Sequence, residues 1–303
     1  MSNLILLFLC LFLGFLLRKF KISSEETPLV LNQYVIYIAL PMMALYYLPN
    51  ITVSPELLFP VSVAWIGFAF AWLFFTLLGK KLNWSRNLIG ALILTSGLGN
   101  TSFVGIPVIS ALYGAEGLQT LIMVDLPGSF VVLSTLGIMV ATIHSEGEAN
   151  FFQIGKAVLK FPPFLVFLIG FTMALFSWHF PEVIKNAIKP LADTVAPIAL
   201  ISVGYQLKIE LESGYWRYIS IGLFVKLILI PLTIYSLYKF LFDQSGIPFE
   251  VSVMEAATGP MITGSIIAIS YGLRPNLSSM MVGIGILTSF ITMAGWYFIL
   301  KLG

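Results

Sequence analysis

Asn100 is the residue best suited to contact a charged substrate, because its amide can donate a hydrogen bond to a carboxylate and carries no charge of its own. It lies in the apolar stretch GLGNTSFVGIP (97–107), together with Thr101, Ser102 and Pro107. We predict that these four residues contact a substrate. The alternatives are an interhelical hydrogen bond from Asn100, worth about 0.6–2 kcal/mol, and hydroxyl groups that bond back to their own backbone.

A second stretch of similar composition, EAATGPMITGS (255–265), contains Thr258, Gly259 and Pro260. Proline lacks the amide hydrogen that a helix needs and glycine lowers helix stability, so each stretch should interrupt a helix near mid-membrane. The interruption would free backbone carbonyls and helix ends that can bind ions and anions. We therefore predict that Thr258, Gly259 and Pro260 complete the substrate site. The alternative is that glycine and proline only permit close packing of membrane helices.

Besides Asp193, which is placed to cap a half-helix near the outer start of the seventh span, three ionisable residues fall within or near the apolar stretches as candidates: Glu255, Asp125 and Lys226. Charged groups inside a membrane are costly and usually functional, so we predict that these three couple the site to an ion. A proton on Glu255, or sodium held near Glu255 by carbonyl and hydroxyl oxygens, would neutralise its charge. Lys226 could pair with Glu255 or Asp125. The alternatives are a solvated Glu255 at the membrane boundary, a Lys226 that snorkels to the surface, and charged pairs that serve only structure.

The composition describes a membrane protein. Hydrophobic residues make up 58% of the chain, charged residues 10%, and the mean hydropathy is +0.97, whereas a soluble domain carries roughly 25% charged residues. The net charge of +2 and the lack of a basic tract exclude nucleic acid as a partner. One cysteine and two histidines are too few for a metal centre, and no HExxH or GxSxG motif suggests an enzyme. We expect no cofactor besides a coupling ion.

The apolar stretches predict ten transmembrane helices, at about 20 residues per crossing. Most lysines and arginines then fall on one face of the membrane, which the positive-inside bias makes the cytoplasmic face. We therefore expect a multi-pass protein of the cell membrane, with both termini outside and the central loop in the cytoplasm. The predicted spans are 2–17, 29–48, 57–79, 87–113, 118–143, 154–177, 184–207, 216–241, 249–271 and 277–301.

The second half of the chain echoes the first. Pro41 matches Pro197 at an offset of 156, and the dipeptide YG at 113–114 matches YG at 271–272 at an offset of 158. Each repeat holds five spans, an odd number, so the two repeats must have opposite orientations in the membrane. Inverted repeats are typical of secondary transporters, because two mirrored halves can produce two mirrored states.

Three motifs, GNTSFVGIP (99–107), LPMMAL (40–45) and VKLILIPL (225–232), together with the proline break in the ninth span, resemble the auxin efflux carrier family. That family includes the plant PIN auxin transporters and bacterial malate and malonate permease-like carriers, and the resemblance covers essentially the whole chain. It implies an all-α fold similar to the sodium/proton antiporter and bile-acid symporter folds, with two broken helices that cross at Pro107 and Pro260.

The resemblance also implies a substrate contact at Asn100, a scaffold of spans 1, 2, 6 and 7, a moving transport unit of the other six spans, and a homodimer through the scaffold. Two features depart from the family pattern. The long cytoplasmic loop of the plant members is reduced here to the short stretch 144–151. Thr258 also stands at the repeat equivalent of Asn100, so the symmetry of the site is not strict.

The sequence thus predicts a polytopic membrane protein with a five-plus-five inverted repeat. Its predicted function is secondary active transport of a small organic anion, either a dicarboxylate or an auxin-like carboxylate, by elevator-type alternating access. The alternatives are an anion channel, an uncoupled facilitator, or an intramembrane enzyme. The predicted divisions are a first repeat at 1–143, a cytoplasmic loop at 144–153 and a second repeat at 154–303.

Overall fold

The computed structural model describes residues 2–51, 54–145, 162–206 and 214–302, and this part of the chain is helical apart from its connections. Residues 146–153 of the predicted central loop and 154–161 of the predicted sixth span lie outside the described residues. The helices of the first half are α1 (Ser2–Lys19), α2 (Thr27–Tyr34), α3 (Leu40–Tyr47), α4 (Leu58–Lys81), α5 (Arg86–Gly97), α6 (Ile106–Met123) and α7 (Ile138–His144). The helices of the second half are α9 (Pro162–Leu175), α10 (Glu182–Ala192), α11 (Val195–Gln206), α12 (Trp216–Phe224), α13 (Ile230–Ser236), α14 (Gly246–Ala256), α15 (Ile262–Ser270) and α16 (Pro275–Leu302).

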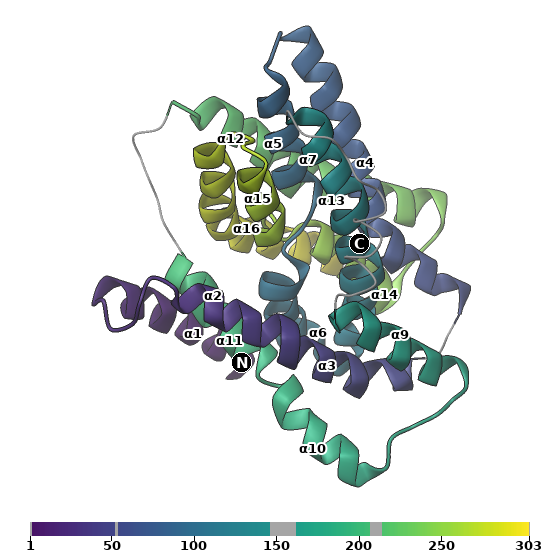
Figure 1. The fold of residues 1–303 in the computed structure, drawn as a ribbon. Helices are drawn as coiled ribbons and strands as arrows, with labels where there is room; N and C mark the ends of the chain where they lie inside the picture. The colour runs from purple at the N-terminus through teal and green to yellow at the C-terminus, as the bar shows by residue number, and fades with distance from the viewer. Residues whose placement is uncertain (1, 52–53, 146–161, 207–213, 303) are drawn as a thin grey trace.

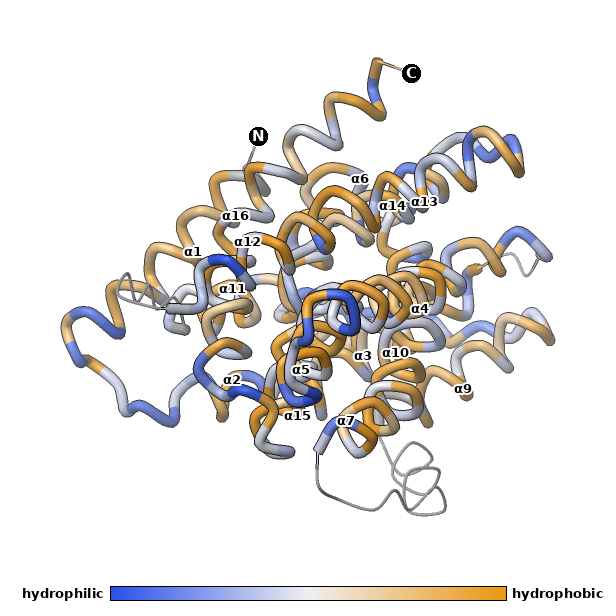
Figure 2. The backbone as a smooth tube through the Cα atoms, turned by 90° about the horizontal axis from the view of Figure 1, so that it is seen from above, coloured by the Kyte–Doolittle hydropathy of each residue, from blue (hydrophilic) through white to orange (hydrophobic). Residues whose placement is uncertain are grey.

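Both the length of the helical segments and their apolar surface are typical of a membrane protein. Six segments of the described chain are long and apolar enough to cross a membrane. Helix α1 carries Phe8 and Phe12 outward, 62% and 57% exposed, as a lipid-facing surface requires. Figure 2 shows hydrophilic residues gathered mainly at helix ends, with predominantly apolar backbone between them. The six segments are Thr27–Asn50, Pro55–Lys81, Thr101–His144, Glu182–Tyr205, Trp216–Leu241 and Pro275–Leu302.

The longest of these segments, Thr101–His144, contains parts of two predicted spans. Its 44 residues are about twice the length that one crossing needs. Gly114 divides it, because its φ of 62° lies in the left-handed region and turns the chain out of the helix. The all-helical membrane architecture is therefore confirmed, while the total of ten crossings stays a prediction.

Proline reshapes several helices. In the π-helical turn η7 (Val225–Leu229), the carbonyl of Leu227 lies four residues before Pro231, which has no N–H to donate to it. This carbonyl accepts the indole N–H of Trp296 at 3.0 Å. The wide turn and the bond from α16 together fix the backbone that carries Lys226. Two further π-helical turns end two residues before a proline: η1 (Val35–Ala39) before Pro41 and η4 (Thr101–Gly105) before Pro107.

The helices gather in two groups. In Figure 1, α1, α2, α3, α9, α10 and α11 lie in the lower half, and α4, α5, α7, α12, α13, α15 and α16 lie above them. We call these the lower and upper groups. Within the lower group, α1 packs along α11, and α3 packs against α9 and α10. Helices α6 and α14 contact each other near the centre, where the two groups meet.

The contact between α1 and α11 brings backbone against backbone. A Cβ at Gly14 would overlap the carbonyl of Ile201, and a Cβ at Gly204 would overlap the carbonyl of Leu11. Small residues permit such close approach between membrane helices.

We expect Gly204→Ala to lower the free energy of unfolding by about 1–3 kcal/mol, because the added methyl group forces the two helices apart. Thermal unfolding in detergent measures the effect. Gly295→Ala on α16 is the matched control, since a Cβ there meets no atom within 4 Å. Equal unfolding temperatures for the two variants would contradict the close contact.

Candidate functional site

Both predicted helix breaks are present. Helix α5 ends at Gly97 and the chain becomes helical again at Thr101, while α14 ends at Ala256 and the chain becomes helical again at Ile262. Each interruption leaves a C-terminal helix end and an N-terminal helix end inside the protein. Gly97 and Gly99 lie at the first interruption and Gly259 and Pro260 lie at the second, because neither residue type supports a helix interior. Pro107, in contrast, lies in the first turn of α6, where a helix tolerates proline, and does not interrupt it.

The two breaks lie against each other and pair. The N–H of Asn100 donates to the carbonyl of Gly259 at 2.7 Å, and the N–H of Met261 donates to the carbonyl of Leu98 at 3.1 Å. These bonds form one antiparallel bridge between two unwound segments that are far apart in sequence. Broken backbone at membrane depth must find such partners, because lipid supplies none.

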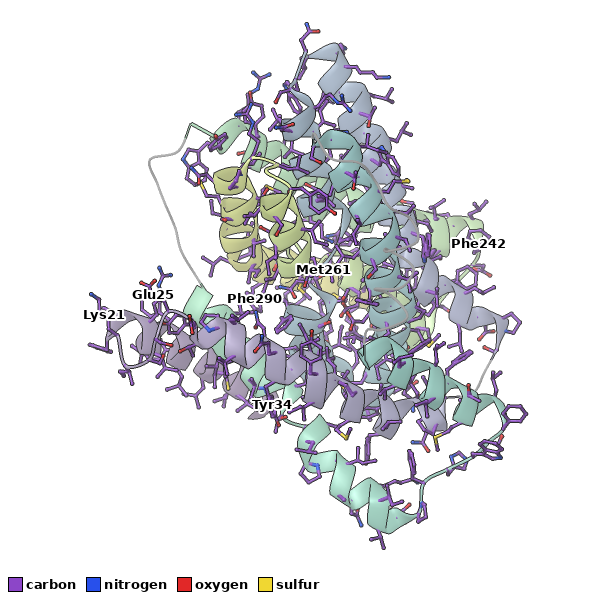
Figure 3. All side chains as sticks on the ribbon, in the orientation of Figure 1. Lys21, Glu25, Tyr34, Phe242, Met261 and Phe290 are labelled. Atoms are coloured by element: carbon purple, nitrogen blue, oxygen red, sulfur yellow. The ribbon has the colours of Figure 1, made fainter. Side chains whose placement is uncertain are left out.

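Two helix N-termini meet at a cavity of about 80 Å³ beside this crossing. Thr101 begins η4, Ile262 begins α15, and both residues line the cavity. Met261, another lining residue, lies near the centre of the molecule in Figure 3. The first amides of a helix carry partial positive charge and bind anions. We call this cavity the asparagine pocket; it is lined by Ile36, Leu40, Asn100, Thr101, Ser102, Phe103, Asp125, Leu126, Phe130, Leu133, Met261, Ile262 and Thr263.

Asn100 offers an unused donor to the asparagine pocket. Its side chain is 1% exposed, and its Oδ1 accepts the N–H of Phe103 at 3.2 Å, which caps η4. Its Nδ2 has no hydrogen-bond partner among the described residues. A buried donor without a partner costs about 1–3 kcal/mol, so this amide group is well placed for a bound acceptor.

Asp125, on the π-helical turn η5 (Val124–Phe130), is held by the hydroxyl groups of the first break. Ser102 Oγ lies 2.7 and 2.8 Å from the two carboxylate oxygens of Asp125, and Thr101 Oγ1 donates to Oδ1. The hydroxyls therefore bond to a neighbouring helix. The alternative that they bond back to their own backbone is wrong for both residues.

The two helix C-termini meet at a smaller cavity of about 10 Å³, which we call the lysine cavity. Gly97 ends α5 and Ala256 ends α14, and both line it. Lys226 Nζ donates to the carbonyl of Ala256 at 2.6 Å, one of the last carbonyls of α14, which have no partner within the helix. The other lining residues are Val63, Ala64, Gly67, Gly99, Thr101, Val124, Ser129, Ile230 and Glu255.

The two remaining charges at the crossing are fully enclosed. Glu255 and Lys226 are each 1% exposed, so a solvated Glu255 and a snorkelling Lys226 are both wrong. The carboxylate oxygens of Glu255 have no hydrogen-bond partner in the part of the chain that the structure describes, and they lie against Gly105, where a Cβ would overlap them. Among the described residues, the ion pairs do not include the expected pairing of Lys226 with Glu255 or Asp125.

Four predicted site residues do not line the asparagine pocket: Pro107, Thr258, Gly259 and Pro260. Thr258 Oγ1 donates at 2.7 Å to the carbonyl of Glu255, three residues earlier in the chain, so this hydroxyl does bond back to its own backbone. Gly259 and Pro260 form the second break and its pairing with the first, whereas Pro107 lies in the first turn of α6, after the first break. The structure thus brings Asn100, Thr101, Ser102 and Asp125 together, and separately Glu255 and Lys226.

Two glycines escaped the sequence prediction as site residues. A Cβ at Gly99 would meet Thr258 Oγ1, the carbonyl of Glu255 at 3.0 Å and Lys226 Nζ at 3.2 Å. Gly105 admits the carboxylate of Glu255 in the same way. The crowding of glycines in GLGNTSFVG was the available signal, but its reason lies in side chains from the other half of the chain.

A large cleft of about 720 Å³ separates the two groups of helices and reaches the crossing. Arg18, Lys21 and Glu25 line it from the lower group, and Ser265 and Ile262 line it from α15. Ile262 also lines the asparagine pocket, so cleft and pocket adjoin. Lys21 and Glu25 lie at the outer end of the lower group in Figure 3. The described residues contain no cluster of His, Cys, Asp and Glu that could hold a metal ion.

Comparison with known proteins identifies the family of the chain. The family model described as membrane transport protein matches residues 1–297. An uncharacterized transporter of Methanocaldococcus jannaschii is 28% identical, with 99% of this chain and 98% of the relative covered. The auxin efflux carrier component 8 of Arabidopsis thaliana is 25% identical, with 98% and 96% covered. The chain is a multi-pass membrane transporter and belongs to the membrane transport protein family, the family of the auxin efflux carriers.

Proposed function

We propose that this chain is a secondary active transporter whose asparagine pocket binds the carboxylate of a small organic anion. The unpaired Nδ2 of Asn100 in that pocket carries the proposal. An amide donor beside two helix N-termini stabilises a carboxylate without a fixed cation, so the anion is bound and still able to leave. The volume of about 80 Å³ admits an acid of a few heavy atoms.

We further propose that the fold is an inverted repeat of ten helices. The matched dipeptides at 113–114 and 271–272 support it, because both of their glycines, Gly114 and Gly272, have a positive φ, of 62° and 70°. Tyr113 lies 5.2 Å from the ammonium of Lys301, near the end of α16, whereas Gly272 lies just before the start of α16. A helix of 28 residues separates its ends by roughly 40 Å. The two equivalent turns therefore lie at opposite ends of α16, as two repeats of opposite orientation require.

Transport in this proposal follows an elevator-type movement of the upper group against the lower group. The cleft between the groups supports it, since the cleft adjoins the asparagine pocket and thereby provides access from one side of the membrane. The basic residues Arg18 and Lys21 in its wall fit the side that we propose to be cytoplasmic, with both termini outside. The lower group corresponds to the scaffold, through which we propose that two copies associate.

Coupling is the third part of the proposal. Asp125 borders the asparagine pocket, where a negative charge would repel a bound carboxylate, so its protonation and substrate binding would support each other. Glu255 and Lys226 place two further ionisable groups on the other side of the crossing. A proton or sodium is the ion that these groups would move.

The test is counterflow in proteoliposomes with labelled malate, malonate and indole-acetate, each with and without sodium. Saturable exchange of one acid, inhibited by the unlabelled acid, is the expected result. Flux that neither saturates nor exchanges would contradict the carrier and favour the channel alternative. No exchange of any acid would place the substrate outside this panel.

We expect Glu255→Gln to remove the dependence of transport on an imposed ion gradient, because the substitution removes a buried group that can change charge. The ratio of uptake with and without the gradient should fall to about one, while exchange at equilibrium continues. A ratio equal to that of the unaltered protein would remove Glu255 from the coupling mechanism.

A further inference from the structure

The lysine cavity has the chemistry of a cation site. Two helix C-termini, those of α5 and α14, point their partial negative charge into it. Glu255 adds a carboxylate whose two oxygens accept no hydrogen bond from the residues that the structure describes. Broken helices of membrane carriers commonly use such carbonyl ends to coordinate sodium.

The ammonium group of Lys226 already provides a cation in the lysine cavity. Lys226 is 1% exposed, and its ammonium donates to the terminal carbonyl of α14 at 2.6 Å. The described structure gives Lys226 no carboxylate partner that would account for its burial. An uncompensated ammonium is expensive to bury, so the carbonyl ends and the nearby negative charge are what stabilise it.

The backbone holds Lys226 in this place. Its π-helical turn, η7, is fixed by the bond from Trp296 to the carbonyl of Leu227, which Pro231 leaves without its helical donor. The ammonium also lies against the first break, 3.2 Å from the position that a Cβ on Gly99 would take. Lys226 therefore touches both broken helices, as a coordinated ion would.

Little room remains for a second cation. The lysine cavity has a volume of about 10 Å³, which corresponds to about one water molecule. A sodium ion in that space would need to lose its hydration shell beside a fixed ammonium of the same sign. The residues present therefore do not fit sodium.

We propose that Lys226 is a built-in cation that replaces sodium at the helix crossing, so that sodium neither binds to this protein nor drives its transport. The prediction that sodium does not drive transport rests on the proposed function, whereas the prediction that sodium does not bind is independent of it. Removal of the ammonium should expose the carbonyl of Ala256 and the carboxylate of Glu255 together, and thereby create a sodium site.

The experiment compares the thermal unfolding temperature of the purified protein in sodium chloride and in potassium chloride of equal concentration, without substrate. We expect no difference for the unaltered protein. We expect Lys226→Met, which keeps an unbranched stem and removes the ammonium group, to be stabilised by several degrees in sodium, because a ligand that binds only the folded state raises its stability. The double variant Lys226→Met/Glu255→Gln should lose this sodium effect.

Two controls separate the site from general effects of charge. Lys239→Met removes a lysine from the same predicted span and should show no response to sodium, and Lys226→Arg, which keeps the charge, should also show none. In proteoliposomes, uptake by the unaltered protein should be equal in the two salts, and uptake by Lys226→Met should rise about tenfold or more in sodium.

Sodium-specific stabilisation or sodium-driven uptake of the unaltered protein would overturn the proposal, and this result does not depend on whether Lys226→Met folds. Equal stability of a folded Lys226→Met in both salts would overturn it as well. If the sodium response of Lys226→Met appears while none of the three acids is exchanged, the built-in cation stands and the substrate lies outside the tested panel.

Discussion

We expect Asn100→Asp to abolish saturable exchange of organic anions while the protein keeps its fold. Aspartate retains an oxygen that can accept the N–H of Phe103, so the cap of η4 is preserved. It lacks the Nδ2 donor, and it places a carboxylate in the pocket beside Asp125. The substituted side chain therefore removes a hydrogen bond to the substrate and adds a charge that repels it.

A hydrogen bond to a charged group is worth about 1.5–3 kcal/mol, which corresponds to a loss of affinity of roughly 10- to 150-fold before repulsion is added. Concentration-dependent counterflow gives the affinity, and thermal unfolding gives the stability. Asn100→Ala should lose the same affinity and, in addition, about 1 kcal/mol of stability, because it also removes the cap. Asn50→Ala is the control, since that side chain is exposed and bonds only to the carbonyl of Tyr46. Exchange by Asn100→Asp with unchanged affinity would exclude Asn100 as the substrate contact.

The second large effect is expected at Gly99, where one methyl group should disrupt the crossing itself. A Cβ there would overlap Thr258 Oγ1 and press on the carbonyl of Glu255 and on Lys226 Nζ, at 3.0 and 3.2 Å. The carbonyl belongs to the backbone of α14, and Lys226 is 1% exposed beside a cavity of only about 10 Å³, so neither group can move far. We therefore expect Gly99→Ala to lower the free energy of unfolding by about 1–3 kcal/mol and to abolish exchange.

The measurement pairs thermal unfolding with counterflow of the acid that the unaltered protein exchanges. Gly295→Ala again serves as the control, because its added methyl group lies in open space on a helix and should leave exchange unchanged without lowering the free energy of unfolding. Wild-type stability and exchange in Gly99→Ala would mean that the two breaks are not packed as described.

Much of this arrangement could be predicted from the sequence because membranes impose simple rules. Lipid allows helices and closed barrels only, so the long apolar stretches indicate an all-helical chain. Proline and glycine act locally on the helix that contains them, so the breaks after Gly97 and Ala256 could be predicted from residue type alone. The predicted end of the fourth span at residue 113 coincides with the left-handed Gly114, where the chain turns out of the helix.

The roles of individual side chains were less accessible. Thr258 was expected beside Asn100 because the two residues occupy equivalent repeat positions, yet its hydroxyl bonds to the carbonyl of Glu255. Lys226 was expected to pair with a carboxylate, and it donates instead to a backbone carbonyl of another helix. Hydropathy and residue spacing predict whether a segment forms a helix and lies in the membrane. Neither predicts which group of the other broken helix a side chain contacts at the crossing.

The sequence by itself determined that this protein is a helical membrane transporter, that two of its helices are interrupted, and which polar residues stand at the interruptions. Only the tertiary structure decided that the helix N-termini meet around Asn100 and Asp125, while the helix C-termini meet around Lys226 and Glu255. The physical reason is that residue type and spacing act over a few neighbouring residues. The partial charge at each of the two cavities comes instead from two helix ends, about 160 residues apart in the chain, that packing brings together.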